Sequence, residues 1–237
     1  EILIKEVHEK PKFEKYKTTY YKNETNCYSH AVGATYPFSE LYRIGAICGK
    51  KPLGQMYFSV EEIKELLFLD GGMGTLLQAE GLAPGELPET WNIEHPEKVE
   101  AIHRRYYEAG SDVVLANTFG ANVCKFHDDR YTVEEVIRAG IANAKRAGEQ
   151  IGKETYVALD MGPTGKLLKP MGDLDFDDAY EAFAEAVRYG EKYGADLIHI
   201  ETMSDTYEVK AAILAAKENS SLPVFVTMIF DERGKLL

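Results

Sequence analysis

The sequence predicts an α/β fold for residues 66–237, in which parallel strands alternate with crossover helices as in the front portion of a (β/α) barrel. Three observations predict this fold. Short apolar runs and longer helical segments follow one another in strict alternation. The runs are apolar throughout, as expected of strands that are buried on both faces. Four consecutive runs end in distinctive polar residues.

The first elements of this segment are two strands and two helices. Residues 67–69 form a short apolar run, which we predict as the first strand. A helix is predicted over 96–109, because a proline stands in its first turn and a glycine follows its end. The β-rich run 112–116 predicts the second strand. The helix predicted over 132–151 is ended by a glycine.

The alternation continues to the end of the sequence. Apolar runs predict strands at 155–159, 196–200 and 224–229, and helices are predicted over 176–193 and 207–218. This makes five strands and four crossover helices. The alternation by itself fits either a doubly wound sheet or a closed barrel of eight strands. A closed barrel typically needs about 250 residues, so we expect about three β/α units to be missing.

The amino-acid composition divides the chain into two unlike parts. Residues 1–65 carry a formal charge of +1, whereas residues 66–237 carry −13. Seven of the fifteen tyrosines also lie in the first part. We therefore predict an N-terminal extension of unknown function at 1–65, folded as a small α+β or irregular segment, followed by an incomplete barrel domain at 66–237.

The composition also restricts the partners and the compartment. The net charge of −12 makes nucleic acid an unsuitable partner. No apolar run approaches the roughly 20 residues that cross a bilayer, so no membrane is expected, and the first residues lack the features of a signal peptide. Three widely spaced cysteines do not form a disulfide framework. We expect a cytoplasmic protein with reduced thiols.

The extension contains one candidate nucleophile. Cys27 follows Asn26, which is a suitable residue to begin a helix, and a helix N-terminus lowers the pKa of a thiol. The run Asn26-Cys27-Tyr28 resembles the opening of papain-like cysteine hydrolase domains. His30 is only one turn away and is unsuited to be the partner base. A cysteine hydrolase that uses Cys27 is one alternative, and a small structural cysteine is the other.

The polar residues that follow the strands indicate a ligand site, because such sites lie at the carboxyl ends of parallel strands. Asp70 and Glu201 together suit an ammonium group, and Asn117 offers both a donor and an acceptor. Gly71 and Gly72 leave backbone N–H groups accessible to an anion. The site therefore fits a small zwitterion such as an amino acid. Each residue also has a structural explanation: a capping aspartate, a common glycine turn, or a glutamate paired with a nearby lysine or arginine.

Five motifs of residues 66–237 resemble the homocysteine S-methyltransferase domain of cobalamin-dependent methionine synthase. They are Asp70-Gly-Gly-Met-Gly-Thr75, Pro88-Glu-Thr-Trp-Asn92, Ala116-Asn-Thr-Phe-Gly120, Asp160-Met-Gly-Pro-Thr-Gly165 and Ile200-Glu-Thr202. They occur in the order and at the spacing of that family. The resemblance implies a (β/α)8 barrel that moves a methyl group to the thiol of homocysteine, giving methionine. It also implies that Asp70 and Glu201 lie near the homocysteine ammonium, and that Gly71, Gly72 and Asn117 hold the amino-acid end.

The resemblance further implies zinc, held by three cysteines, and methylcobalamin on a separate cobalamin-binding domain or methyl-donor module. No residue of this sequence matches a zinc cysteine, so we assign no metal ligand and no catalytic residue, and we expect no tight zinc binding. Cys124 is interpreted as an unligated thiol. The resemblance alone thus indicates a methyltransferase fragment that lacks the zinc side. The alternative is an inactive truncated or fused chain that only associates, through open sheet edges.

Overall fold

The computed structural model describes residues 67–236, nearly all of which belong to one compact unit of residues 68–231 and 235–237. The predictions for the extension, including the helix at Asn26 and the role of Cys27, lie outside the described residues. Within the described residues, none of the helices is long and apolar enough to cross a membrane.

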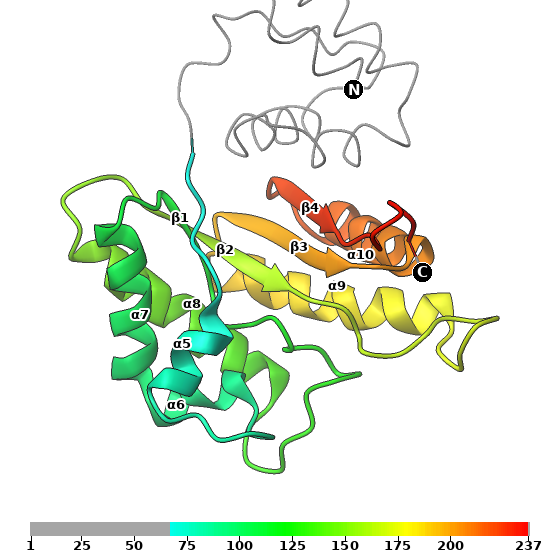
Figure 1. Cartoon of the computed structure of the whole chain (residues 1–237), viewed down its shortest axis with the longest axis horizontal. Helices are drawn as coiled ribbons and strands as arrows, with labels where there is room; N and C mark the ends of the chain where they lie inside the picture. The colour runs from blue at the N-terminus through cyan, green and yellow to red at the C-terminus, as the bar shows by residue number, and fades with distance from the viewer. Residues whose placement is uncertain (1–66, 237) are drawn as a thin grey trace, which may run out of the picture. The chain divides into compact units, whose positions relative to one another are not determined.

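Four parallel strands form one sheet in the order β1-β2-β3-β4, which is also their order along the chain (Figure 1). Their bounds are Val113–Leu115, Tyr156–Met161, Leu197–Met203 and Val224–Met228. Each strand therefore pairs with its neighbour in the chain through a helical crossover, as in the wall of a (β/α) barrel.

Helices connect the strands and precede the first of them. The crossover helices are α8 (Val133–Glu149), α9 (Phe176–Lys192) and α10 (Thr206–Asn219), while α5 (Met73–Ala79), η4 (Pro88–Thr90), α6 (Trp91–Glu94) and α7 (Pro96–Glu108) come before β1. Local chemistry fixes the starts of two crossover helices. Thr132 and Glu135 form a reciprocal capping box at the start of α8. Asp205 accepts a hydrogen bond from the Tyr207 N–H at the start of α10.

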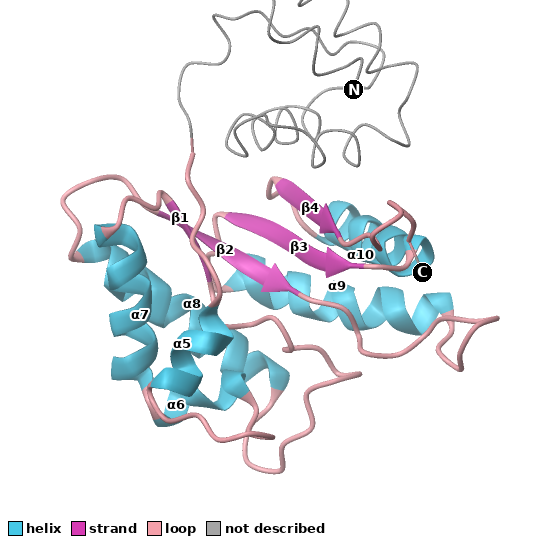
Figure 2. Cartoon of the chain, viewed as in Figure 1, coloured by secondary structure: helices cyan, strands magenta, loops and turns pink. Residues whose placement is uncertain are grey.

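The main core lies on one face of the sheet. Alternate strand positions such as Val157, Leu159 and Ile198 are fully or almost fully buried in one cluster with apolar residues of α8, α9 and α10. The opposite face carries a smaller cluster around Val113, Ala158 and Leu197. Figure 2 shows α9 and α10 along the same side of the strands. Helices on one face distinguish a barrel wall from a doubly wound sheet, which is covered on both faces. The predicted partial barrel is thus confirmed.

The structure differs from the prediction at the first strand. Residues 67–69 are not a full strand, because only Leu69 makes a bridge, with Val113. The carbonyl of Phe68 accepts hydrogen bonds from the N–H groups of Asp112 and Val113. Pairing stops there because the chain turns at Gly71 and Gly72 into α5. The sheet therefore has four strands and a bridge within 67–236, instead of five full strands.

The helix boundaries are predicted closely and the strand ends less closely. The four predicted helices match α7, α8, α9 and α10 to within two residues at each end. In contrast, β3 runs on to Met203, so Glu201 lies inside a strand and not after it. Asp160 likewise lies inside β2. Their polar side chains are tolerated there because they stand on the inner face of the sheet, away from the apolar helix layer.

Candidate functional site

The strand register brings three polar side chains to the inner face of the sheet. Asp160 of β2 pairs directly with His199 of β3, and Glu201 follows His199 by two residues on the same strand. Their ligand atoms lie within 4.8 Å of one another, so Glu201 shares this face although the register of β3 is irregular between Ile200 and Met203. Asp70 joins them from the turn after the Leu69 bridge, since the charge of Glu201 acts on its carboxylate.

The carboxylate of Asp70 is held by the adjacent strand. Its Oδ2 accepts a hydrogen bond from the Leu115 N–H at 3.0 Å. Its Oδ1 is buried and has no hydrogen-bond partner among residues 67–236. Burial raises the pKa of Asp70 to about 8, and the nearby charge of Glu201 adds to that rise. A cation placed beside Asp70 would favour the ionised carboxylate and so lower its pKa again.

The pKa values of the other two carboxylates, Asp160 and Glu201, are also raised. Burial raises the pKa of Asp160 well above its ordinary value, and the charges of Glu201 and Asp70 raise it further. Burial also raises the pKa of Glu201. Three carboxylates close enough to disfavour one another's ionisation form a site that attracts positive charge.

His199 is a member of this cluster that the sequence-based prediction missed. Its Nδ1 lies 3.8 Å from Oε2 of Glu201. Burial lowers the pKa of His199 to about 4, so the imidazole is neutral at pH 7. A signal was available in the sequence, because His199 lies within the predicted strand 196–200 and precedes Glu201 by two residues, the spacing at which strand side chains share a face.

Gly71 and Gly72 lie at the exposed turn that leads into α5. Gly72 is the residue before the first turn of α5, and its carbonyl accepts a hydrogen bond from the Tyr106 hydroxyl at 3.1 Å. A Cβ atom added at Gly71 would lie 3.1 Å from the same hydroxyl. The small size of Gly71 therefore permits the close approach of Tyr106, and the proposed contact with a ligand anion stays a prediction.

Asn117 is directed towards η4 and α6. Its Nδ2 donates to the carbonyl of Pro88 at 2.7 Å and to Oδ1 of Asn92 at 3.0 Å, and its side chain is buried. A ligand held by Asn117 would use the side-chain oxygen or displace one of these bonds. The predicted contact with the amino-acid end therefore also stays a prediction.

Three buried polar residues that were given no role position the loops after the strands. Oε1 of Glu89 accepts from the Gly120 N–H at 2.6 Å. The Nδ2 of Asn92 donates to the carbonyl of Asn117 at 2.7 Å. On the next loop, Oε1 of Glu208 accepts from the Thr164 N–H at 2.7 Å. Glu89 and Asn92 belong to the motif 88–92, so the motif itself was the available signal.

The described residues do not fit the zinc site that the family resemblance implies. Cys124 is the one cysteine among them. It is half-buried, and burial raises the pKa of its thiol, which favours the neutral form over the thiolate that binds zinc. Within residues 67–236 the group with metal-ligand spacing is Asp160, His199 and Glu201, which contains no sulfur.

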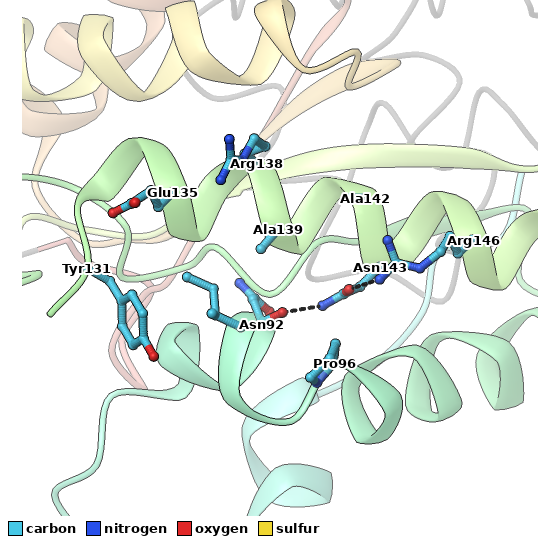
Figure 3. A pocket seen from close by; sticks show the side chains of 10 residues that line it. Asn92, Pro96, Tyr131, Glu135, Arg138, Ala139, Ala142, Asn143 and Arg146 are labelled. Carbon is cyan, nitrogen blue, oxygen red and sulfur yellow. Dashed lines mark hydrogen bonds between the residues drawn. The ribbon is translucent and has the colours of Figure 1, made fainter.

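A groove of about 270 Å³ lies beside α6 and α8. Figure 3 shows that Asn92 and Asn143 meet across it, and the Nδ2 of Asn143 donates to the Asn92 carbonyl at 3.0 Å. Arg146 in turn donates to Oδ1 of Asn143. None of the predicted site residues lines this groove. Asn92, Asn143 and Arg146 thus bond to one another across the groove, so we interpret it as a seam between two helices.

Comparison with known proteins identifies the family of the chain. The profile of the homocysteine S-methyltransferase family matches residues 67–237. Methionine synthase of Mycobacterium tuberculosis (strain ATCC 25618 / H37Rv) is 34% identical over 186 residues, and that of Mycobacterium leprae (strain TN) is 32% identical over the same length. Each alignment covers 71% of this chain but only 15% of the relative.

Solved structures share the fold. The homocysteine methyltransferase MmuM from Escherichia coli in its metallated form superposes with a TM-score of 0.65 at 20% identity, over 74% of this chain and 67% of MmuM. Its oxidized form gives the same TM-score at 19% identity, over 75% of this chain and 66% of MmuM. At such identities the likeness concerns the fold alone. By the family profile, this chain belongs to the homocysteine S-methyltransferase family.

Proposed function

We propose that this chain holds the amino-acid end of homocysteine for transfer of a methyl group to its thiol, as in enzymes of the methionine synthase type. The observation that carries the proposal is the Oδ1 atom of Asp70, which is buried and has no hydrogen-bond partner among residues 67–236. The charge of Glu201, from β3, acts on the same carboxylate and raises its pKa. An ammonium group between the two carboxylates would be held by two charge-assisted hydrogen bonds.

The roles of the remaining residues follow from their positions. The exposed backbone at Gly71 and Gly72 is available to the carboxylate of the amino acid. Asn117, whose nitrogen is engaged within the protein, offers its side-chain oxygen. The loop bonds of Glu89 and Glu208 keep the segments around the site in place.

Activation of the thiol and supply of the methyl group are assigned to groups outside the described residues. The family's zinc favours the thiolate of its ligands when it is bound. The described residues provide no thiolate set for it, so we derive no step through zinc. A methyl donor such as methylcobalamin on a separate module would complete the reaction.

Homocysteine binding to the full chain, measured by calorimetry, tests the proposal. Asp70→Asn and Glu201→Gln should each weaken binding by about tenfold or more, because each removes one charged partner of the ammonium. An analogue of homocysteine without the amino group should bind more weakly than homocysteine and should be insensitive to both substitutions.

The matched control is Asp177→Asn, which neutralises an exposed carboxylate on α9. It should leave homocysteine binding unchanged. Equal affinity for homocysteine and for the analogue without the amino group would show that the carboxylates do not recognise the ammonium, and the proposal would then fail.

A further inference from the structure

A compact set of metal-binding atoms lies on the inner face of the sheet and, among residues 67–236, includes no cysteine. Asp160, His199 and Glu201 each offer one ligand atom, and these atoms all lie within 4.8 Å of one another. From this geometry we propose that Asp160, His199 and Glu201 bind a divalent transition-metal ion such as Zn²⁺ or Co²⁺.

The sheet itself fixes the geometry of the three donors. Asp160 and His199 are directly opposed across the β2–β3 pair. Glu201 lies two residues further along β3, just where the register with β4 becomes irregular between Ile200 and Met203. All three residues therefore belong to strands and not to loops. Donors on such a framework are held more precisely than donors on loops.

The spacing is close to that of a metal site. Ligand atoms on opposite sides of an octahedral ion with bonds of about 2.1 Å are about 4.2 Å apart. Since no two of the ligand atoms are more than 4.8 Å apart, the widest separation has to shrink by at most roughly half an ångström. Side-chain rotation accommodates such a change, and Nδ1 of His199 already lies 3.8 Å from Oε2 of Glu201.

The carboxylate of Asp160 gives a second, independent indication of a ligand. Asp160 is only 6% exposed, and its Oδ1 has no hydrogen-bond partner among residues 67–236. A buried carboxylate oxygen without a partner is costly, and buried charges are normally paired or coordinate metals. The same carboxylate supplies an oxygen to the set whose other members are a His199 nitrogen and a Glu201 oxygen.

The donor types select the class of ion. Two carboxylates and one imidazole, with open positions for water, suit first-row transition ions better than they suit soft ions, which prefer thiolates. An imidazole also distinguishes the site from an all-oxygen site for Mg²⁺ or Ca²⁺. This inference does not rest on the proposed function, although Glu201 is shared, because it concerns the chain in the absence of homocysteine.

Cobalt titration of the full chain, without homocysteine, tests the inference by absorption spectroscopy. We expect visible cobalt bands that saturate at one equivalent, carry no thiolate charge-transfer band, and disappear when Zn²⁺ is added. Cys124→Ser should leave them unchanged. His199→Gln and Asp160→Asn should each weaken binding by at least the roughly tenfold to hundredfold that the loss of an outer-shell partner costs.

A gain of signal separates ligation from a purely structural role. In a background that carries Cys27→Ser, Cys48→Ser and Cys124→Ser, Asp160→Cys should produce a thiolate-to-cobalt charge-transfer band, since only a side chain that contacts the ion can create it. Circular dichroism checks that each variant folds. The absence of saturable cobalt bands in the parent chain, or of the charge-transfer band in folded Asp160→Cys, would overturn the inference. Homocysteine binding without cobalt binding would overturn the metal site alone.

Discussion

At the scale of single residues, His103 is the most costly buried base of the described chain. It is fully buried on α7, and neither ring nitrogen has a hydrogen-bond partner among residues 67–236. Burial lowers the pKa of His103 to about 3. The unfolded chain binds a proton there near pH 6.5, whereas the folded chain does not. His103 therefore costs stability as the pH falls from about 6.5 to about 3.

We expect His103→Leu to reduce the acid sensitivity of the fold. The free energy of unfolding of the parent should fall by up to about 1.4 kcal/mol per pH unit in that window from this residue alone. The variant should lack the part of this pH dependence that His103 causes. Urea unfolding at several pH values measures the free energy of unfolding, and the same pH dependence in the variant and the parent would contradict the role given to His103.

Asp70 should act in the opposite direction. The unfolded chain loses the Asp70 proton near pH 3.8, while the folded chain keeps it up to about pH 8. Stability should therefore fall as the pH rises through this window. Asp70→Asn retains an acceptor for the Leu115 N–H and removes the ionisation. Without ligand, the variant should be more stable relative to the parent near pH 8 than near pH 4. A difference in the free energy of unfolding between variant and parent that is the same at pH 4 and pH 8 would contradict this prediction.

At the scale of elements, the start of α8 depends on a reciprocal cap. The Thr132 hydroxyl accepts from the Glu135 N–H at 3.2 Å, and the Glu135 carboxylate accepts from the Thr132 N–H at 2.9 Å. Thr132→Ala should lower the free energy of unfolding by about 1 kcal/mol. Asp175→Ala is the matched control, because Asp175 precedes α9 without a side-chain cap bond. Equal losses would show that the box contributes nothing beyond the residue type.

The loop after β1 depends on the contact between Glu89 and Gly120. A Cβ atom at Gly120 would lie 2.7 Å from Oε1 of Glu89, which is buried and already bonded to the Gly120 N–H. Gly120→Ala should therefore cost about 1–3 kcal/mol. Gly74→Ala, in α5, meets no atom within 4 Å and should be neutral or stabilising. Thermal unfolding compares the two, and a tolerated Gly120→Ala would contradict the close contact.

At the scale of the whole molecule, β4 is an edge. Within residues 67–236 it pairs only with β3, and Ile229 just beyond it is 50% exposed. An open strand edge beside an exposed apolar side chain favours association of the chain with itself. Light scattering should show a mass that rises with concentration. Ile229→Lys should reduce the rise, whereas Val123→Lys, at an exposed loop position away from β4, should not. A concentration-independent monomer would exclude this association.

The sequence by itself determined the order of the elements and the family. Apolar periodicity, prolines and glycines locate α7 to α10, because these signals act within a few residues of the chain. The spaced motifs carried the family resemblance, and the family profile confirms it over residues 67–237. Asp70 and Glu201 are candidates from the sequence because charged residues that follow apolar runs are conspicuous, and their contact with a ligand stays a prediction.

Tertiary structure decided what depends on register and burial. The pairing of Asp160 with His199 follows from a β2–β3 alignment that no local pattern specifies. The inward direction of the Asn117 amide depends on Pro88 of η4 and Asn92 of α6, which lie 29 and 25 residues before it. The shortening of the first strand to one bridge depends on the turn into α5. Local preferences set which residues form strands and helices. The electrostatic environment and the hydrogen-bond partners of a buried side chain arise only when segments distant in the sequence meet.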